Sequence, residues 1–216
     1  MYEIFLSGGP VMYPLLACSI ISLTVIIERL LFWVQVGMHR NQPVTDEVLE
    51  LSRIGDWQAI RRLTKDSRDY VVRILIAGIL HREFSMAKAM ESAAADELRR
   101  MHQFMGVLDT MITVAPLLGI FGTVIGIIVS FEALGSIGIE QPRAVTAGIA
   151  QALITTAAGL GIAILSVFPY NYFNSRIENA ALTIEKYATS LEIVYEKLTQ
   201  QTNVCEGRGN EDTQRN

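Results

Sequence analysis

Long apolar runs, separated by stretches rich in charge, form the main pattern of this sequence. The runs that are long enough to cross a membrane cover residues 11–36, 104–134 and 147–172. The third run holds no charge, and the first two hold charged residues near their ends: Glu28, Arg29, Asp109 and Glu132. A helix needs about 20 residues to cross roughly 30 Å of hydrocarbon, and none of the runs alternates apolar and polar residues as barrel strands do. The pattern predicts an all-α integral membrane protein with three transmembrane helices, two of which extend into a cytoplasmic helical bundle.

The segment between the first two runs, residues 37–103, is dense in both signs of charge and is predicted to be a cytoplasmic helical segment. Helix breaks are predicted where Asn, Pro, Gly, Asp and Ser occur, at 41–43, 55–56 and Ser67. Residues 70–80 are apolar but too short to span, so they are predicted to pack inside the bundle. Residues 85–100 are predicted to form a helix that leads directly into the second run.

The segment after the third run, residues 173–199, is predicted to continue as a cytoplasmic helix. Its apolar residues recur every seven positions, at Ile177, Ile184, Leu191 and Leu198. This spacing places one stripe on a helix face, where it can pack against a neighbouring helix. Residues 200–216 are polar and are predicted to be a disordered tail.

Basic residues flank the apolar runs almost entirely on one side, which predicts the orientation. They are Arg40, Arg53, Lys88, Arg99, Arg100, Arg176 and Lys186. Residues 1–10 contain no basic residue, and the loop 135–146 contains Arg143 alone. We therefore expect the N-terminus and this loop outside the cell membrane, a cytoplasmic C-terminus, and a first run that is retained rather than cleaved as a signal peptide.

Composition excludes several function classes. The 18 basic and 22 acidic residues are intermixed, so there is no basic surface for nucleic acid. The three histidines and two cysteines form no metal or nucleophile motif, and no nucleotide-binding loop is present. We expect neither an enzyme nor a bound cofactor.

Small and hydroxyl-bearing residues mark the second and third runs. In the second they are Pro116, Gly119, Gly122, Thr123 and Gly126, and in the third Gly148, Gln151, Thr155, Thr156 and Gly159. Glycines four apart let another helix backbone approach closely. Amides and hydroxyls must face protein or water rather than lipid. Residue chemistry alone leaves two interpretations open, tight helix packing with interhelical hydrogen bonds or a hydrated ion path. The carbonyl of Ile112, which Pro116 frees, is available to Thr113 or a neighbouring helix.

The charged residues near the run ends are interpreted as membrane-rim side chains that snorkel towards water. Glu28 and Arg29 are adjacent and do not share a helix face, so an intrahelical pair between them is not expected.

The order of these features resembles the ExbB/TolQ branch of the MotA/TolQ/ExbB proton-channel superfamily, over nearly the whole chain up to about residue 198. The motifs that carry the resemblance are 28–33 (ERLLFW), 115–126 (APLLGIFGTVIG) and 147–161 (AGIAQALITTAAGLG). The resemblance implies a homopentamer in the bacterial inner membrane around a single-span ExbD/TolR-like subunit with a membrane aspartate. It also implies a motor, driven by protons or sodium ions, that energises a periplasmic TonB/TolA-like protein. Thr123 and Thr156 match the two pore threonines of the family.

One position departs from the family pattern: Gln151 stands where ExbB and TolQ have a glutamate. Glutamine does not titrate. Either the carboxylate of the partner suffices, or the ion is sodium, or the residue is engineered. We expect Thr123, Gln151, Thr155 and Thr156 to line the ion path, with the neighbouring glycines giving the partner helix room to turn. The alternative is a non-conducting membrane scaffold, while a transporter of inverted repeats is disfavoured because no internal repeat is present.

Overall fold

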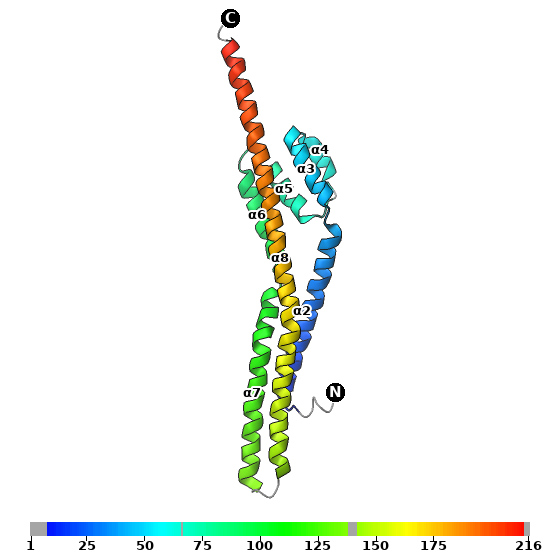
Figure 1. Ribbon diagram of the computed structural model, residues 1–216, viewed down its shortest axis with the longest axis vertical. Helices are drawn as coiled ribbons and strands as arrows, with labels where there is room; N and C mark the ends of the chain where they lie inside the picture. The colour runs from blue at the N-terminus through cyan, green and yellow to red at the C-terminus, as the bar shows by residue number, and fades with distance from the viewer. Residues whose placement is uncertain (1–7, 66, 138–141, 214–216) are drawn as a thin grey trace. The chain divides into compact units, whose positions relative to one another are not determined.

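The computed structural model describes residues 8–65, 67–137 and 142–213, together with their side chains except those of 133, 136–145 and 201–213 (Figure 1). The elements within these residues are α-helices: α2 Met12–His39, α3 Gln42–Ile54, α4 Trp57–Leu63, α5 Tyr70–Leu80, α6 Met86–Met101, α7 Met105–Ile137 and α8 Pro142–Thr213. Among the described residues, the segments that contain α2, α7 and α8 are long and apolar enough to cross a membrane. The predicted all-α fold with three such helices is confirmed.

The chain divides into two compact units, which share α2 and α8. The first unit contains residues 1–31 and 103–175, and the second contains residues 32–102 and 176–216. Each helix that is shared therefore contributes one part to each unit.

The first unit is a packing of α2, α7 and the N-terminal part of α8, with a small apolar core. This core consists of Ala115 of α7, Met12 and Leu15 of α2, and Val11 in the turn just before α2. The opposite face of α7 is exposed and apolar, at Leu117, Phe121, Val124, Ile128 and Phe131. Such an apolar surface suits lipid or other protein chains rather than water.

The second unit has α5 at its centre. Val71, Val72, Ile74 and Leu75 of this short helix are at most 1% exposed. The close approach of α6 to α5 requires Gly78, because a Cβ there would lie 2.5 Å from Met90 Cγ. The prediction that residues 70–80 pack inside a helical bundle is confirmed.

Local capping explains the breaks between the short helices. The side chain of Asn41 caps α3 and that of Asp56 caps α4, while Gly55 ends α3 in the left-handed region at φ 78°. Asp69 caps α5 by accepting a hydrogen bond from Val71 N. The predicted breaks at 41–43, 55–56 and near Ser67 are confirmed.

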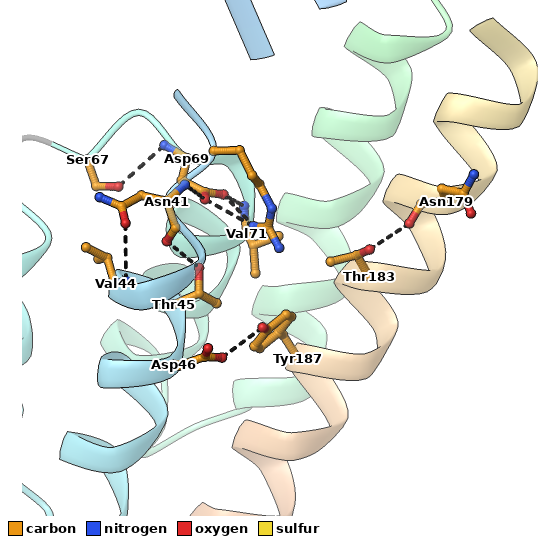
Figure 2. A network of polar contacts seen from close by, with 11 residues as sticks. Asn41, Val44, Thr45, Asp46, Ser67, Asp69, Val71, Asn179, Thr183 and Tyr187 are labelled. Atoms are coloured by element: carbon orange, nitrogen blue, oxygen red, sulfur yellow. Dashed lines mark hydrogen bonds and ion pairs between the residues drawn. The ribbon is translucent and has the colours of Figure 1, made fainter. Parts of the chain in front are cut away.

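The apolar stripe on α8 is also confirmed, and its partners lie in the same chain. Ile177, Ile184 and Leu191 are at most 5% exposed. On the same helix, the Tyr187 hydroxyl donates a hydrogen bond of 2.8 Å to Asp46 Oδ1 on α3 (Figure 2). The stripe therefore packs α8 onto the second unit.

The helix predicted over residues 85–100 is present as α6, and it leads into the second apolar run through a short turn rather than without a break. A turn separates α6 from α7, with Phe104 at φ 62°. A non-glycine residue in the left-handed region ends the helical hydrogen-bond pattern. The boundary between the two units falls at this turn.

Parts of the predicted organisation lie outside the described residues. These are most of the N-terminal tail, residues 138–141 of the loop, and the side chains of residues 201–216. The backbone of α8 is helical as far as Thr213, and the predicted disorder of 200–216 stays a prediction.

Candidate functional site

Two helices of the first unit, α7 and α8, meet through glycine. A Cβ on Gly119 would lie 3.0 Å from Thr155 O, and one on Gly126 would lie 2.8 Å from Gly148 O. A Cβ on Gly159 would collide with Ala115 O. The two backbones are therefore nearly in contact, as small residues at a helix interface allow.

The two threonine hydroxyls of the third apolar run lie near one carbonyl of α7, that of Gly119. Thr156 Oγ1 donates to Gly119 O at 3.1 Å. Thr155 Oγ1 donates to Ala152 O at 2.8 Å and lies 3.5 Å from Gly119 O, and this residue is 0% exposed. Thr156 therefore links α8 to α7, whereas the shorter hydrogen bond of Thr155 stays within α8.

Thr123 lies on the same side of α7, one turn beyond Gly119. Its side chain is partly exposed, and its hydroxyl donates to Ile120 O at 2.5 Å. Thr123 and Thr156 thus donate to two successive carbonyls of α7, Ile120 O and Gly119 O, and Thr155 is more deeply buried than either. A hydroxyl has one donor and two acceptor positions, so each of these oxygens keeps acceptor capacity after donating.

Gln151 lies on a different side of α8. A Cβ on Gly9 would collide with Gln151 Nε2, so the amide is against the backbone that precedes α2. At 3.6 residues per turn, the five positions from Gln151 to Thr156 place the two side chains about 140° apart. The polar residues of the third apolar run therefore lie on two sides of α8, with Thr156 towards α7 and Gln151 towards the start of α2.

Pro116 lies within α7, and of the two groups expected to satisfy the carbonyl that it frees, Thr113 does not do so. Thr113 Oγ1 donates to Asp109 O at 3.2 Å and not to Ile112 O. The reason is helix geometry: the carbonyl four residues back lies beside a threonine hydroxyl.

Glu28 and Arg29 do form an ion pair, contrary to expectation. Arg29 Nε lies 2.5 Å from Glu28 Oε2, and Arg29 Nη2 lies 2.6 Å from Glu28 Oε1. The long arginine side chain reaches back around the helix, so the spacing of Cβ atoms does not decide the contact. Arg29 is 1% exposed and its guanidinium lies 5.6 Å from the ring centre of Phe104, whereas Asp109 and Glu132 on α7 are exposed. The rim role of the four residues stays a prediction.

Sequence reasoning missed Ser130, which belongs to the same interface. It is 4% exposed, and its Oγ donates to Gly126 O at 2.9 Å. A Cβ on Gly148 would collide with this hydroxyl. The available signal was its position four residues after Gly126.

Comparisons with known proteins agree on one family. Residues 67–186, more than half of the chain, match the model of the MotA/TolQ/ExbB proton channel family. A putative biopolymer transport protein, ExbB-like 3 of Synechocystis sp., is 34% identical over 91% of this chain and 95% of its own. A putative ExbB homolog of Methanothermobacter thermautotrophicus is 32% identical over 85% of this chain and 66% of its own. The Tol-Pal system protein TolQ of Pseudomonas aeruginosa is 38% identical over 48% of this chain and 44% of its own.

Proposed function

The chain belongs to the MotA/TolQ/ExbB proton channel family and is a multi-pass membrane protein of its ExbB/TolQ type; on that premise we propose that it is the channel and stator subunit of an ion-driven motor. In this proposal five copies surround a single-span ExbD/TolR-like subunit in a bacterial inner membrane, with the N-terminus periplasmic. Proton flow turns one part against the other and energises a TonB/TolA-like periplasmic protein.

The observation that carries the proposal is the state of the threonine hydroxyls. The protons of Thr123 and Thr156 are donated to Ile120 O and Gly119 O. The oxygens that remain accept hydrogen bonds, so they suit a protonated carboxyl group or a cation and do not donate to an ionised carboxylate. A partner aspartate would be held here when protonated and released when ionised.

This difference in affinity is what couples ion flow to movement. A ligand shifts a conformational equilibrium only by its differential affinity for the two states. A membrane aspartate that binds the threonines in one protonation state and leaves them in the other supplies that difference. Gln151 takes no proton, so the titrating group belongs to the partner in this mechanism.

A non-conducting scaffold is the second candidate, because each hydroxyl described above bonds within the subunit. Such bonds hold helices together whether or not ions pass. The two functions differ in what they require of Thr156. A scaffold tolerates valine at this position as long as the complex assembles, whereas the motor needs the oxygen.

The test is proton flux into liposomes that contain the chain and its single-span partner. Thr156→Val should lower flux by several-fold to about tenfold, since one hydrogen bond is lost. Thr156→Ser keeps the oxygen and should retain flux. Thr110→Val is the matched control, because its hydroxyl is exposed and donates to Gly106 O at 2.7 Å, on the helix's own backbone. Full flux in Thr156→Val, with partner co-purification intact, would remove Thr156 from the ion path. No flux in the unchanged chain, with the complex assembled, would leave the scaffold as the function.

The same liposomes test the ion and Gln151. Proton flux in the unchanged chain, with no gain in Gln151→Glu, would agree with a partner aspartate as the titrating group. Flux that is found only in Gln151→Glu would contradict the proposed mechanism. Flux that follows a sodium gradient instead would reassign the driving ion.

A further inference from the structure

The turn before α2 lies against α8, and the side chain that it meets there is Gln151. Gly9 has a left-handed backbone at φ 70°. A Cβ on Gly9 would collide with Gln151 Nε2, and the three atoms nearest to that Cβ all belong to Gln151. Glycine is therefore needed at position 9 for two reasons, its backbone conformation and the close approach of this amide side chain.

Hydrogen bonds and apolar burial fix the turn in place. Met12 N donates to Gly9 O at 3.1 Å, and Leu15 N donates to Val11 O at 3.3 Å. Val11 and Leu15 are buried, and Ile154 of α8 packs against the cluster to which they belong. The turn and the start of α2 thus give Gln151 a fixed surface to press against.

Contacts on two sides oppose rotation of α8 about its own axis. Thr156 bonds to Gly119 O on α7, and Gln151 contacts Gly9 about 140° away around α8. The two positions are five residues apart, which is about 7.5 Å along the helix axis. A helix that packs on one neighbour alone can turn by small amounts against it. A second contact on another side, at nearly the same level, resists that turn.

The place of the Thr156 oxygen depends on this rotation. Cα atoms lie about 2.3 Å from the helix axis, so a turn of roughly 20° moves the Cα of Thr156 by about 0.8 Å. Good hydrogen bonds between oxygen atoms vary in length by only about 0.5 Å. A small rotation of α8 is therefore enough to move the oxygen out of reach of a partner group.

We propose that Gln151 is a positioning residue, which holds the turn before α2 against α8 and so keeps Thr156 in place for the carboxyl group of the partner. This role rests on the proposed function, in which Thr156 belongs to the ion path. It differs from a role in which the Gln151 amide itself meets the ion. A covalent link between positions 9 and 151 can replace a positioning contact, but it cannot replace an amide that binds an ion.

A reversible disulfide between these positions provides the test in the full chain. The sulfur of a cysteine at 151 takes the place of Gln151 Cγ, which lies 3.5 Å from where the Cβ of residue 9 would be. Disulfides join Cβ atoms about 3.5–4.5 Å apart, so the two positions are close enough. The variant combines Gly9→Cys and Gln151→Cys in a background of Cys18→Ala and Cys205→Ser, which removes both natural thiols.

Proton flux is measured in liposomes that contain the variant and its single-span partner, after oxidation, after reduction and after renewed oxidation. Thiol alkylation followed by mass spectrometry gives the fraction of the link that has formed. The matched controls are the single variants Gly9→Cys and Gln151→Cys in the same background, since neither can form the link within one chain. The background alone serves as the reference for flux.

The linked form should conduct about as fast as the background, and reduction should lower its flux by several-fold to about tenfold, reversibly. The single variants should conduct slowly in both redox states. A link that forms without restoring flux would overturn the positioning role, as would full flux in the reduced form, and reactive thiols that form no link would overturn the contact. No flux in the background would overturn the proposed function and this role with it, whereas a conducting background with an unresponsive pair would overturn this role alone.

Discussion

Replacing Asp69 by asparagine should destabilise the second unit, because this buried carboxylate joins three segments. Its side chain is 0% exposed. Arg40 Nη1 donates to its two oxygens at 3.0 and 3.1 Å, Asn41 N donates at 2.8 Å, and Val71 N donates at 2.9 Å (Figure 2). The carboxylate thus fixes the end of α2, the cap of α3 and the start of α5.

The magnitude follows from which of these bonds an amide can keep. Asparagine retains one oxygen and replaces the other by an NH₂ group, which repels both Arg40 and the backbone donor that faces it. Each hydrogen bond to a charged group contributes about 1.5–3 kcal/mol. The Arg40 side chain is 23% exposed, so water can replace part of the hydrogen bonding that Arg40 loses in the variant. We expect the free energy of unfolding to fall by about 3 kcal/mol, which is the lower end of the range for breaking a buried ion pair.

Thermal unfolding followed by tryptophan fluorescence measures this cost, because Trp33 and Trp57 both belong to the second unit. For a chain of this length the expected fall in Tm is roughly 6–12 °C. Glu50→Gln is the matched control: its partner Arg53 and Glu50 itself are 62% and 64% exposed, so the cost should be below about 0.5 kcal/mol. Equal shifts in Asp69→Asn and Glu50→Gln would refute the reasoning, as would unchanged hydrogen exchange at Val71.

Two further predictions concern the helix interface and alkaline pH. In Gly122→Ala the new Cβ would lie 2.5 Å from Thr155 Oγ1, so overpacking should lower the free energy of unfolding by about 1–3 kcal/mol. Gly135→Ala places its Cβ in open space on the same helix, so it should cost nothing and gain up to about 1 kcal/mol from helix propensity; equal effects of the two changes would contradict the interface. Burial and the hydrogen bond to Asp46 raise the pKa of Tyr187 above 10.0, so the folded state keeps a proton that the unfolded state has lost, and stability should fall as pH rises through that pKa. Tyr187→Phe should remove one late step from the phenolate absorbance titration, and an unchanged titration would contradict the assignment.

The helix ends could be predicted because their causes are local. Asn41 and Asp56 cap the helices that follow them, and Gly55 supplies the left-handed residue that ends α3. Each signal acts within four residues of the sequence. Phe104 gives no such signal, since left-handed backbone is usually supplied by glycine or asparagine. The turn before α7 therefore depends on packing between distant segments.

The composition of the candidate site was predictable, but the segments that cover its sides were not. Helix periodicity places Gln151 and Thr156 about 140° apart on α8. Two different segments cover these sides, α7 beside Thr156 and the residues before α2 beside Gln151. A single helix pattern carries no information on how many neighbours share its polar face.

The arrangement of α7 and α8 also limits which chemistry this subunit can supply. Thr123 and Thr156 have already donated their protons to backbone carbonyls, and Gln151 does not titrate. The acidic residues of α7, Asp109 and Glu132, lie towards its ends, 14 and nine positions from Thr123 along the helix. At 1.5 Å per residue these separations are about 21 Å and 14 Å, beyond the reach of a carboxylate side chain. Neither carboxylate of α7 therefore reaches the threonines, so a proton that passes their level needs water or a carboxylate from outside α7.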